Sequence, residues 1–266
     1  MANGSNSRRP PPFPGTRAKA AALVREQFVK AQEYQKKLAA ASDDPEKKPE
    51  RDLSMEALVD VLEGRRVVHH HTHRHDDIVT VLRLAAEFDF KVVLQHVSDA
   101  WMVADEIAAS DNVVGSSLIL IDRPGGKIEA KDNRFESAVA LERVGALVGF
   151  HADDGVTDSR LFARMAALAV RSGMSREKAL YGLTMAGAIM LGLEDRIGSL
   201  TVGKDADLAI FSRDPLSVYS QVLETWVDGE KVFDRANEKD RLYAEGGYGA
   251  SHDQSSHVHE LEMEEH

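Results

Sequence analysis

The sequence predicts an α/β fold built on a parallel sheet, followed by a small antiparallel β unit. Between about residues 66 and 171, short strand-like runs alternate with amphipathic helical segments, and the connections between them are short. Such alternation is typical of βα units that form a parallel sheet. After Arg196 the pattern changes to short β-branched runs separated by glycines, which is typical of antiparallel strands.

Residues 1–52 are expected to form a loop, a long helix and a charged linker. Apolar residues recur at helical steps from Thr16 to Ala41, with Lys and Glu between them, which predicts a helix. The linker, residues 42–52, contains two prolines. A short helix, MEALVDVLE, should follow, with Ser54 as its N-cap and Gly64 at its end.

Residues 53–196 carry the α/β alternation. We expect strands at residues 66–71, 91–95, 112–115 and 147–151, and helices at residues 77–88, 99–109, 134–144 and 158–171. Ser175 should cap one more helix with the sequence SREKALYGLTMAGAIMLGL.

Residues 197–235 and 236–266 differ from the preceding part of the chain. The runs LAIF, TWV and KVF, with a turn at Asp228-Gly229, predict a small antiparallel β unit over residues 197–235. Residues 236–266 are polar and contain four scattered histidines. We expect this last segment to be a mostly disordered tail.

The composition argues against several kinds of partner, ligand and cellular location. The formal net charge of −11 speaks against a nucleic-acid partner. The absence of cysteine excludes disulfides and thiolate metal ligands. No apolar run approaches the roughly 20 residues of a membrane span, and the opening MANGSNSRRPPPFPGTR lacks the apolar stretch of a signal peptide. We therefore expect a cytoplasmic protein with no membrane or nucleic-acid partner.

The stretch VVHHHTHRHDDI holds five of the chain's 11 histidines. His71 lies at the end of the first predicted strand of the alternation, His96 at the end of the second, and Asp153 just after the fourth. In parallel α/β sheets the functional groups collect at the carboxyl ends of strands. Two imidazoles and a carboxylate suit a divalent cation, so these residues are candidate metal ligands.

Each of these residues also has a simpler interpretation. The histidine run can be a solvated edge strand, His96 a packed core residue, and the Asp-Asp-Gly sequence a turn and helix cap. The equivalent positions of all three candidates favour the metal site. Because strands have a period of two, His73 should share the face of His71, whereas His70 should point to the other face.

Two segments resemble a known family. The run LEDRIGSLTVGKDADLAIFSRDPL with VLETWVDGEKVFD resembles the C-terminal signature of the amidohydrolase superfamily. HTHRHDDI, VLQHVSDA and FHADDGVTDSRLF resemble strands five, six and eight of its imidazolonepropionase-like branch. The resemblance extends from about Gly4 to Asp234.

The resemblance implies a metal-dependent (β/α)8 (TIM) barrel with a small β-sandwich, which hydrolyses C–N bonds of cyclic amides, imides, amidines or dipeptides. His71 would bind the metal, expected to be zinc. His96 would bind metal or anchor the attacking water, and Asp153 would bind metal and carry protons. We expect His73, Arg74 and His151 beside the small-molecule substrate.

The chain departs from the family pattern in one respect. The family places an H-x-H pair on strand one and a Lys or Glu on strand four, and this sequence has neither. NGSNSRRPPPFPGTR resembles the loop after strand four, which implies that residues 53–196 form the C-terminal half of the barrel. We expect a complementary N-terminal half or a second copy as partner. The alternatives are an inactive remnant that serves as a binding or scaffold subunit, and a His-rich metal-binding protein.

Overall fold

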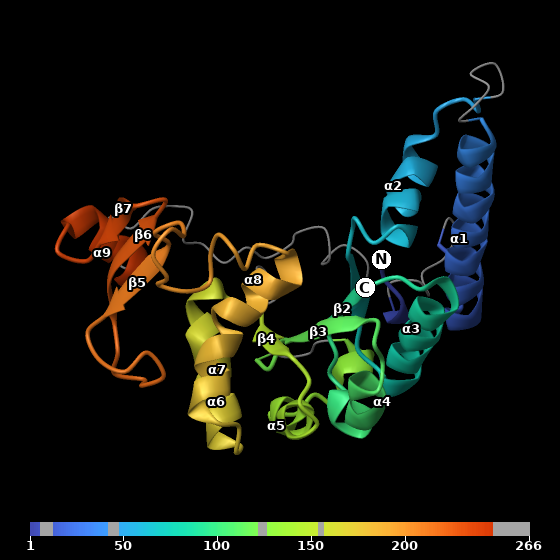
Figure 1. The fold of residues 1–266 in the computed structure, drawn as a ribbon. Helices are drawn as coiled ribbons and strands as arrows, with labels where there is room; N and C mark the ends of the chain where they lie inside the picture. The colour runs from blue at the N-terminus through green and yellow to red at the C-terminus, as the bar shows by residue number, and fades with distance from the viewer. Residues whose placement is uncertain (6–12, 42–47, 122–126, 154–156, 247–266) are drawn as a thin grey trace. The chain divides into compact units, whose positions relative to one another are not determined.

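The computed structural model describes residues 1–5, 13–41, 48–121, 127–153 and 157–246. The chain forms two compact units, shown in Figure 1. The first unit comprises Met1–Leu118 and Gly126–Val148, and the second comprises Ile119–Gly125 and Gly149–His266. None of the helices that the structure describes has the length and apolar character needed to cross a membrane.

A four-stranded sheet has the order β1–β2–β3–β4. Its strands are β1 (Val68–Thr72), β2 (Val92–His96), β3 (Val113–Leu118) and β4 (Val148–Phe150). β1 pairs with β2, and β2 with β3, in parallel. Val92, Val93 and Leu94 of β2 are fully buried, as expected for a parallel strand covered on both faces. The predicted α/β fold with a parallel sheet, as part of a barrel, is confirmed.

The first residues of the chain lie beside β1. Ala2 forms a parallel bridge with His71. The backbone N–H of His71 donates to the carbonyl of Met1 over 2.9 Å, and the N–H of Asn3 donates to the carbonyl of His71 over 3.2 Å. The Met1–Asn3 segment therefore pairs with the edge of β1 that faces away from β2, and it fixes the backbone of His71 there.

Helices accompany the strands of the first unit, in the order α1 (Arg17–Ala40), α2 (Leu53–Leu62), α3 (His75–Phe88), the 3₁₀ turn Ala100–Met102, α4 (Ala104–Ala108), the 3₁₀ turn Ile128–Ala130 and α5 (Glu136–Arg143). α1 and α2 lie side by side (Figure 1) around a cluster of Ala31, Tyr34, Met55 and Val59. The predicted cap of α2 is wrong. The N-cap is Asp52, because its carboxylate accepts from the backbone N–H groups of Ser54 and Met55.

A stack of three aromatic rings attaches α1 to the sheet region. The ring of Phe28 on α1 stacks on Phe88 at a centroid distance of 5.0 Å and on Phe90 at 4.8 Å. Phe28 is fully buried. The apolar face predicted for α1 therefore packs, through Phe28, against Phe88 at the end of α3 and Phe90 just before β2.

The second unit contains the 3₁₀ turn Ser159–Leu161 and the helices α6 (Phe162–Arg171), α7 (Arg176–Gly182) and α8 (Met185–Leu191). The single helix predicted after Ser175 is wrong, because α7 and α8 are separate. At Thr184 the backbone leaves the helical region, with φ −133° and ψ −92°, and its hydroxyl donates to the carbonyl of Leu180 over 3.0 Å. This bond to a neighbouring carbonyl competes with a continuous helix.

The predicted antiparallel β unit is confirmed. It consists of β5 (Leu208–Phe211), β6 (Val222–Val227) and β7 (Glu230–Asp234). Asp228 and Gly229 have φ of 51° and 77°, the positive values that a tight hairpin turn requires. The predicted disordered tail is wrong over Glu238–Glu245, which form α9 with Asn237 as N-cap. The rest of that tail, residues 247–266, lies outside the described residues.

Candidate metal centre

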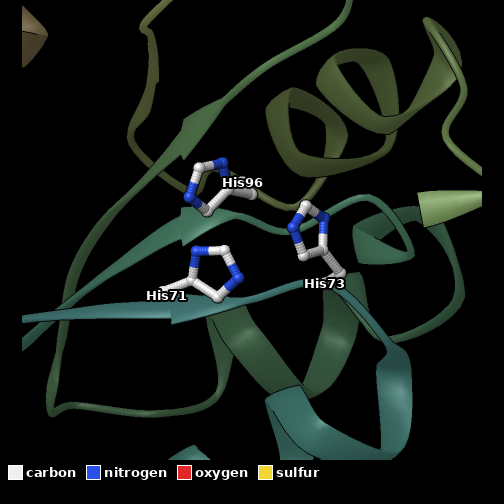
Figure 2. Close-up of side chains that lie close together, drawn as sticks. All are labelled: His71, His73 and His96. Atoms are coloured by element: carbon white, nitrogen blue, oxygen red, sulfur yellow. The ribbon is translucent and has the colours of Figure 1, made fainter. Parts of the chain in front are cut away.

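Three histidines converge where β1 and β2 end. His71 lies in β1, His73 follows that strand, and His96 is the last residue of β2. Each offers one ring nitrogen, and these nitrogens lie within 4.8 Å of one another. Figure 2 shows the three rings grouped above the two strands. The period of two in a strand explains why His71 and His73 reach the same side.

The rings lie close enough to share one ion. The ring centroids of His71 and His96 are 4.3 Å apart, and His73 lies 4.8 Å from each of them. His73 and His96 are buried. Nε2 of His71 is a buried nitrogen with no hydrogen-bond partner among the described residues. Three neutral imidazoles at this separation can each give one ring nitrogen to a divalent cation. The residues therefore fit a divalent metal ion.

Ser98 orients one of the three rings. Its hydroxyl lies 2.8 Å from Nδ1 of His73, and Ser98 is fully buried. When Nδ1 carries the proton, it donates to Ser98, and Nε2 keeps its lone pair for a metal. Hydrogen bonds of this kind fix the tautomer and the direction of metal-binding histidines.

The backbone is strained where β2 ends. His96 has φ 72° and Val97 has φ 40°, values that are uncommon outside glycine and exceptional for a β-branched residue. The N–H of Val97 still donates to the carbonyl of Thr72 over 2.9 Å. Strain of about 1–3 kcal/mol for each such residue persists only where the surroundings enforce it, and it is concentrated at functional sites.

A histidine–carboxylate pair, His75 and Asp99, lies next to the cluster of three histidines. The carboxylate of Asp99 accepts from the backbone N–H of His75 over 3.1 Å and lies 3.0 Å from Nδ1 of that residue. His75 begins α3 and is exposed, whereas Asp99 is buried. Asp99 thus ties the start of α3 to the segment after β2, and His75 lies outside the three-histidine group.

Glu129 brings a carboxylate to the cluster. Its Oε1 lies 3.9 Å from Nε2 of His71. The hydroxyl of Ser5 donates to Glu129 over 2.7 Å, and the backbone N–H of Ser5 donates to the same carboxylate. Burial alone would raise the pKa of Glu129, but His71 and the two Ser5 donors outweigh it and lower the pKa to about 2. Glu129 is therefore ionised. It was not among the residues predicted from the sequence, because no strand end or motif singles it out.

The remaining histidines of the stretch have structural roles. His70 is buried on the other face of β1, as predicted, and burial lowers its pKa to about 3. Its Nδ1 lies 3.0 Å from the carbonyl of His71. Nδ1 of His69 lies 2.8 Å from the side-chain nitrogen of Gln95. His70 is thus a neutral core residue.

The structure therefore brings two of the three predicted ligands together, His71 and His96, and adds His73. Arg74, predicted beside the substrate, pairs with Asp76 over 3.0 Å. It lines a cavity of about 230 Å³ with Ser5, Arg17, Lys127, Ile128 and Glu129. The metal and substrate roles of these residues stay predictions.

Asp153 and His151 belong to the second unit. Both follow β4, and Asp153 is exposed with φ 51°. The roles predicted for them, proton transfer and metal binding at Asp153 and substrate binding at His151, stay predictions.

Comparison with known proteins gives consistent matches. A family model described as the amidohydrolase family matches residues 50–233. The amidohydrolase tasK of Hapsidospora irregularis is 28% identical over 185 residues, which cover 69% of this chain and 19% of that protein. An amidohydrolase structure from Thermotoga maritima MSB8 superposes with a TM-score of 0.81 and 34% identity, over 88% of this chain and 62% of that chain.

A prolidase complexed with N-methylphosphonate-L-proline superposes with a TM-score of 0.50 and 15% identity, over 68% of this chain and 49% of that chain. At this identity the likeness shows the fold alone. The matched region spans less than two thirds of the length of each of these three relatives.

Proposed function

Because the chain belongs to the amidohydrolase family, we propose that it takes part in the metal-dependent hydrolysis of C–N bonds. The observation that carries this proposal is the convergence of His71, His73 and His96 where β1 and β2 end. Enzymes built on parallel α/β sheets and barrels place their active sites at this end of the strands. The proposed substrates are cyclic amides, imides, amidines or dipeptides, as in the imidazolonepropionase-like branch that the sequence resembles.

His71, His73 and His96 would hold the cation, which we propose to be zinc. Three imidazole nitrogens are a common ligand set for catalytic zinc, which keeps a further position open. A bound zinc ion lowers the pKa of its water to about 7 and polarises a carbonyl group. Within the chain, Ser98 holds His73 from the opposite ring nitrogen, so the site is supported before metal binds.

Proton transfer is assigned to Asp153. In this proposal its carboxylate takes a proton from the attacking water and delivers it to the leaving nitrogen, which is general acid–base chemistry. Arg74 and His151 are proposed to contact the substrate. These roles rest on the resemblance of FHADDGVTDSRLF and HTHRHDDI to strands eight and five of the family.

We further propose that activity requires a partner. β1 and β4 are the end strands of the described sheet, and β1 is covered by the short Met1–Asn3 segment. Four strands do not close a barrel, and open sheet edges favour association. The partner is a complementary N-terminal half or a second copy of the chain.

The test is hydrolysis of hydantoins, dipeptides and imidazolones by the zinc-supplemented chain, alone and with an N-terminal half of a related amidohydrolase. The chain alone should show little or no turnover, and the mixture should be active. Asp153→Asn should abolish that activity, whereas Asp105→Asn, a change at an exposed aspartate of α4, should not.

Two results would contradict the proposal. Turnover by the monomeric chain that disappears in Asp153→Asn would show that no partner is needed. Zinc binding without turnover in any mixture would instead favour an inactive, metal-binding descendant of the family.

A further inference from the structure

We propose that Glu129 is a positioning residue of the metal centre, which holds the ligand His71 through one ring nitrogen and leaves the other nitrogen to the cation. This inference rests on the proposed metal centre at His71, His73 and His96. It assigns a role to a carboxylate that follows β3 and lies 58 residues from His71 in the sequence.

The carboxylate of Glu129 is buried and faces the histidine cluster. Its side chain is 2% exposed, and its Oε1 faces Nε2 of His71 across 3.9 Å. Arg17 and Arg74 line the same cavity, but they pair with Asp77 and Asp76. Burial of a carboxylate is costly unless the group is paired or hydrogen-bonded. A divalent ion at the neighbouring histidines would add a positive charge beside this carboxylate.

The chain fixes the carboxylate in place. Met1–Asn3 pairs with β1 at His71, and Ser5 then gives Glu129 two hydrogen bonds. Gly4 has φ +75°, and a Cβ added there would lie 2.2 Å from Oε2 of Glu129. The positive φ favours glycine, and a Cβ at this position would have to push the Glu129 carboxylate aside. The same segment therefore holds both members of the pair.

The distance between the two side chains fits an outer partner of a ligand. Oε1 of Glu129 lies 3.9 Å from Nε2 of His71, the nitrogen without a hydrogen-bond partner in the described part of the chain. An N–H···O bond spans about 2.7–3.2 Å, so a small ring rotation closes it. Glu129 lies outside the group whose ligand atoms are within 4.8 Å of one another. A carboxylate that accepts from the second nitrogen of a metal-bound histidine is a common arrangement.

The test compares zinc affinity of the full chain and of Glu129→Gln, measured by competition with a chromophoric chelator. Glutamine keeps the shape and the acceptor but removes the charge. We expect affinity to fall about 10–100-fold, the usual effect of losing such an outer partner. Glu87→Gln is the matched control, because it removes the same charge from an exposed carboxylate that pairs with Arg25. Zinc affinity within about threefold of the parent in Glu129→Gln would overturn the inference.

A double-mutant cycle shows whether Glu129 acts through His71. In a His71→Ala background, Glu129→Gln should cause little further loss of zinc affinity. An equal loss with and without His71 would overturn the positioning role. Thermal unfolding of the zinc-free variants checks that each is folded, and ¹⁵N NMR of labelled histidines reads the tautomer of His71 directly. In the zinc-bound parent, Nε2 should carry the proton, and an Nε2 that instead binds zinc would overturn the inference.

The outcomes separate this inference from the proposed function. If His71→Ala and His96→Ala weaken zinc binding but Glu129→Gln does not, the metal centre stands and only the role of Glu129 fails. If neither histidine variant changes zinc affinity, the metal centre itself fails, and the inference fails with it. Zinc bound elsewhere in the chain affects the parent and the variants equally.

Discussion

Removal of the Ser98 hydroxyl should weaken metal binding without unfolding the chain. The Ser98→Ala substitution deletes the group that lies 2.8 Å from Nδ1 of His73. Because Ser98 is fully buried, water has little access to replace the hydroxyl. The imidazole then loses the contact that fixes its tautomer and its direction toward His71 and His96.

The size of the effect follows from this one contact. A buried partner that loses its hydrogen bond costs about 1–3 kcal/mol. Since about 1.4 kcal/mol corresponds to a tenfold change in affinity, the zinc dissociation constant should rise about 5- to 150-fold.

Zinc competition titration of the parent, Ser98→Ala and Ser54→Ala would measure the effect. Ser54 is exposed on α2, so its variant should bind zinc like the parent. The unfolding temperature of zinc-free Ser98→Ala must show that the variant is folded. A folded Ser98→Ala variant with unchanged zinc affinity would refute the role assigned to Ser98 and place His73 outside the ligand set.

Three further predictions follow. Asp153→Asn should lower kcat of the complemented enzyme about 100-fold or more, because a general acid–base group contributes a factor of about 10²–10⁴ to the rate. Equal turnover in parent and variant would contradict this assignment. Phe28→Ala should lower the free energy of unfolding by about 3–5 kcal/mol, measured by urea denaturation. Its exposed neighbour Val29 (42% exposed) gives the control Val29→Ala, and equal losses in both would show that the ring stack does not anchor α1. Gly4→Ala should weaken zinc binding, because its Cβ would displace the carboxylate of Glu129; unchanged affinity in a titration would show that the segment tolerates the methyl group.

The core of the site could be predicted from the sequence because it lies at strand ends. Strand periodicity placed His71 and His73 on one face and His70 on the other, and the structure confirms both. Local pattern is sufficient here, since the carboxyl ends of neighbouring parallel strands lie together. Glu129 could not be found in this way. Its contact with His71 depends on how the loop after β3 meets the first residues of the chain.

The differences between the predicted and the observed secondary structure have local causes. Asp52 and Ser54 are both good N-caps, and the sequence alone does not decide between them. Thr184 interrupts a helix that the apolar pattern continues, because its backbone and hydroxyl adopt a local alternative. The short α9 escaped prediction because its residues are mostly polar, with none buried.

The positive φ of Val97 links the stability of the protein core to the chemistry of the site. The side chain of Val97 is fully buried, and burial of such a side chain contributes about 1.5–3 kcal/mol. That gain is similar to the cost of the strained backbone, about 1–3 kcal/mol. The direction of the His96 side chain therefore depends on how well Val97 packs against its apolar neighbours. Substitutions around Val97 that contact no metal ligand should therefore change the metal affinity. In such variants, thermal stability and metal affinity should vary together, and directed evolution could select for both.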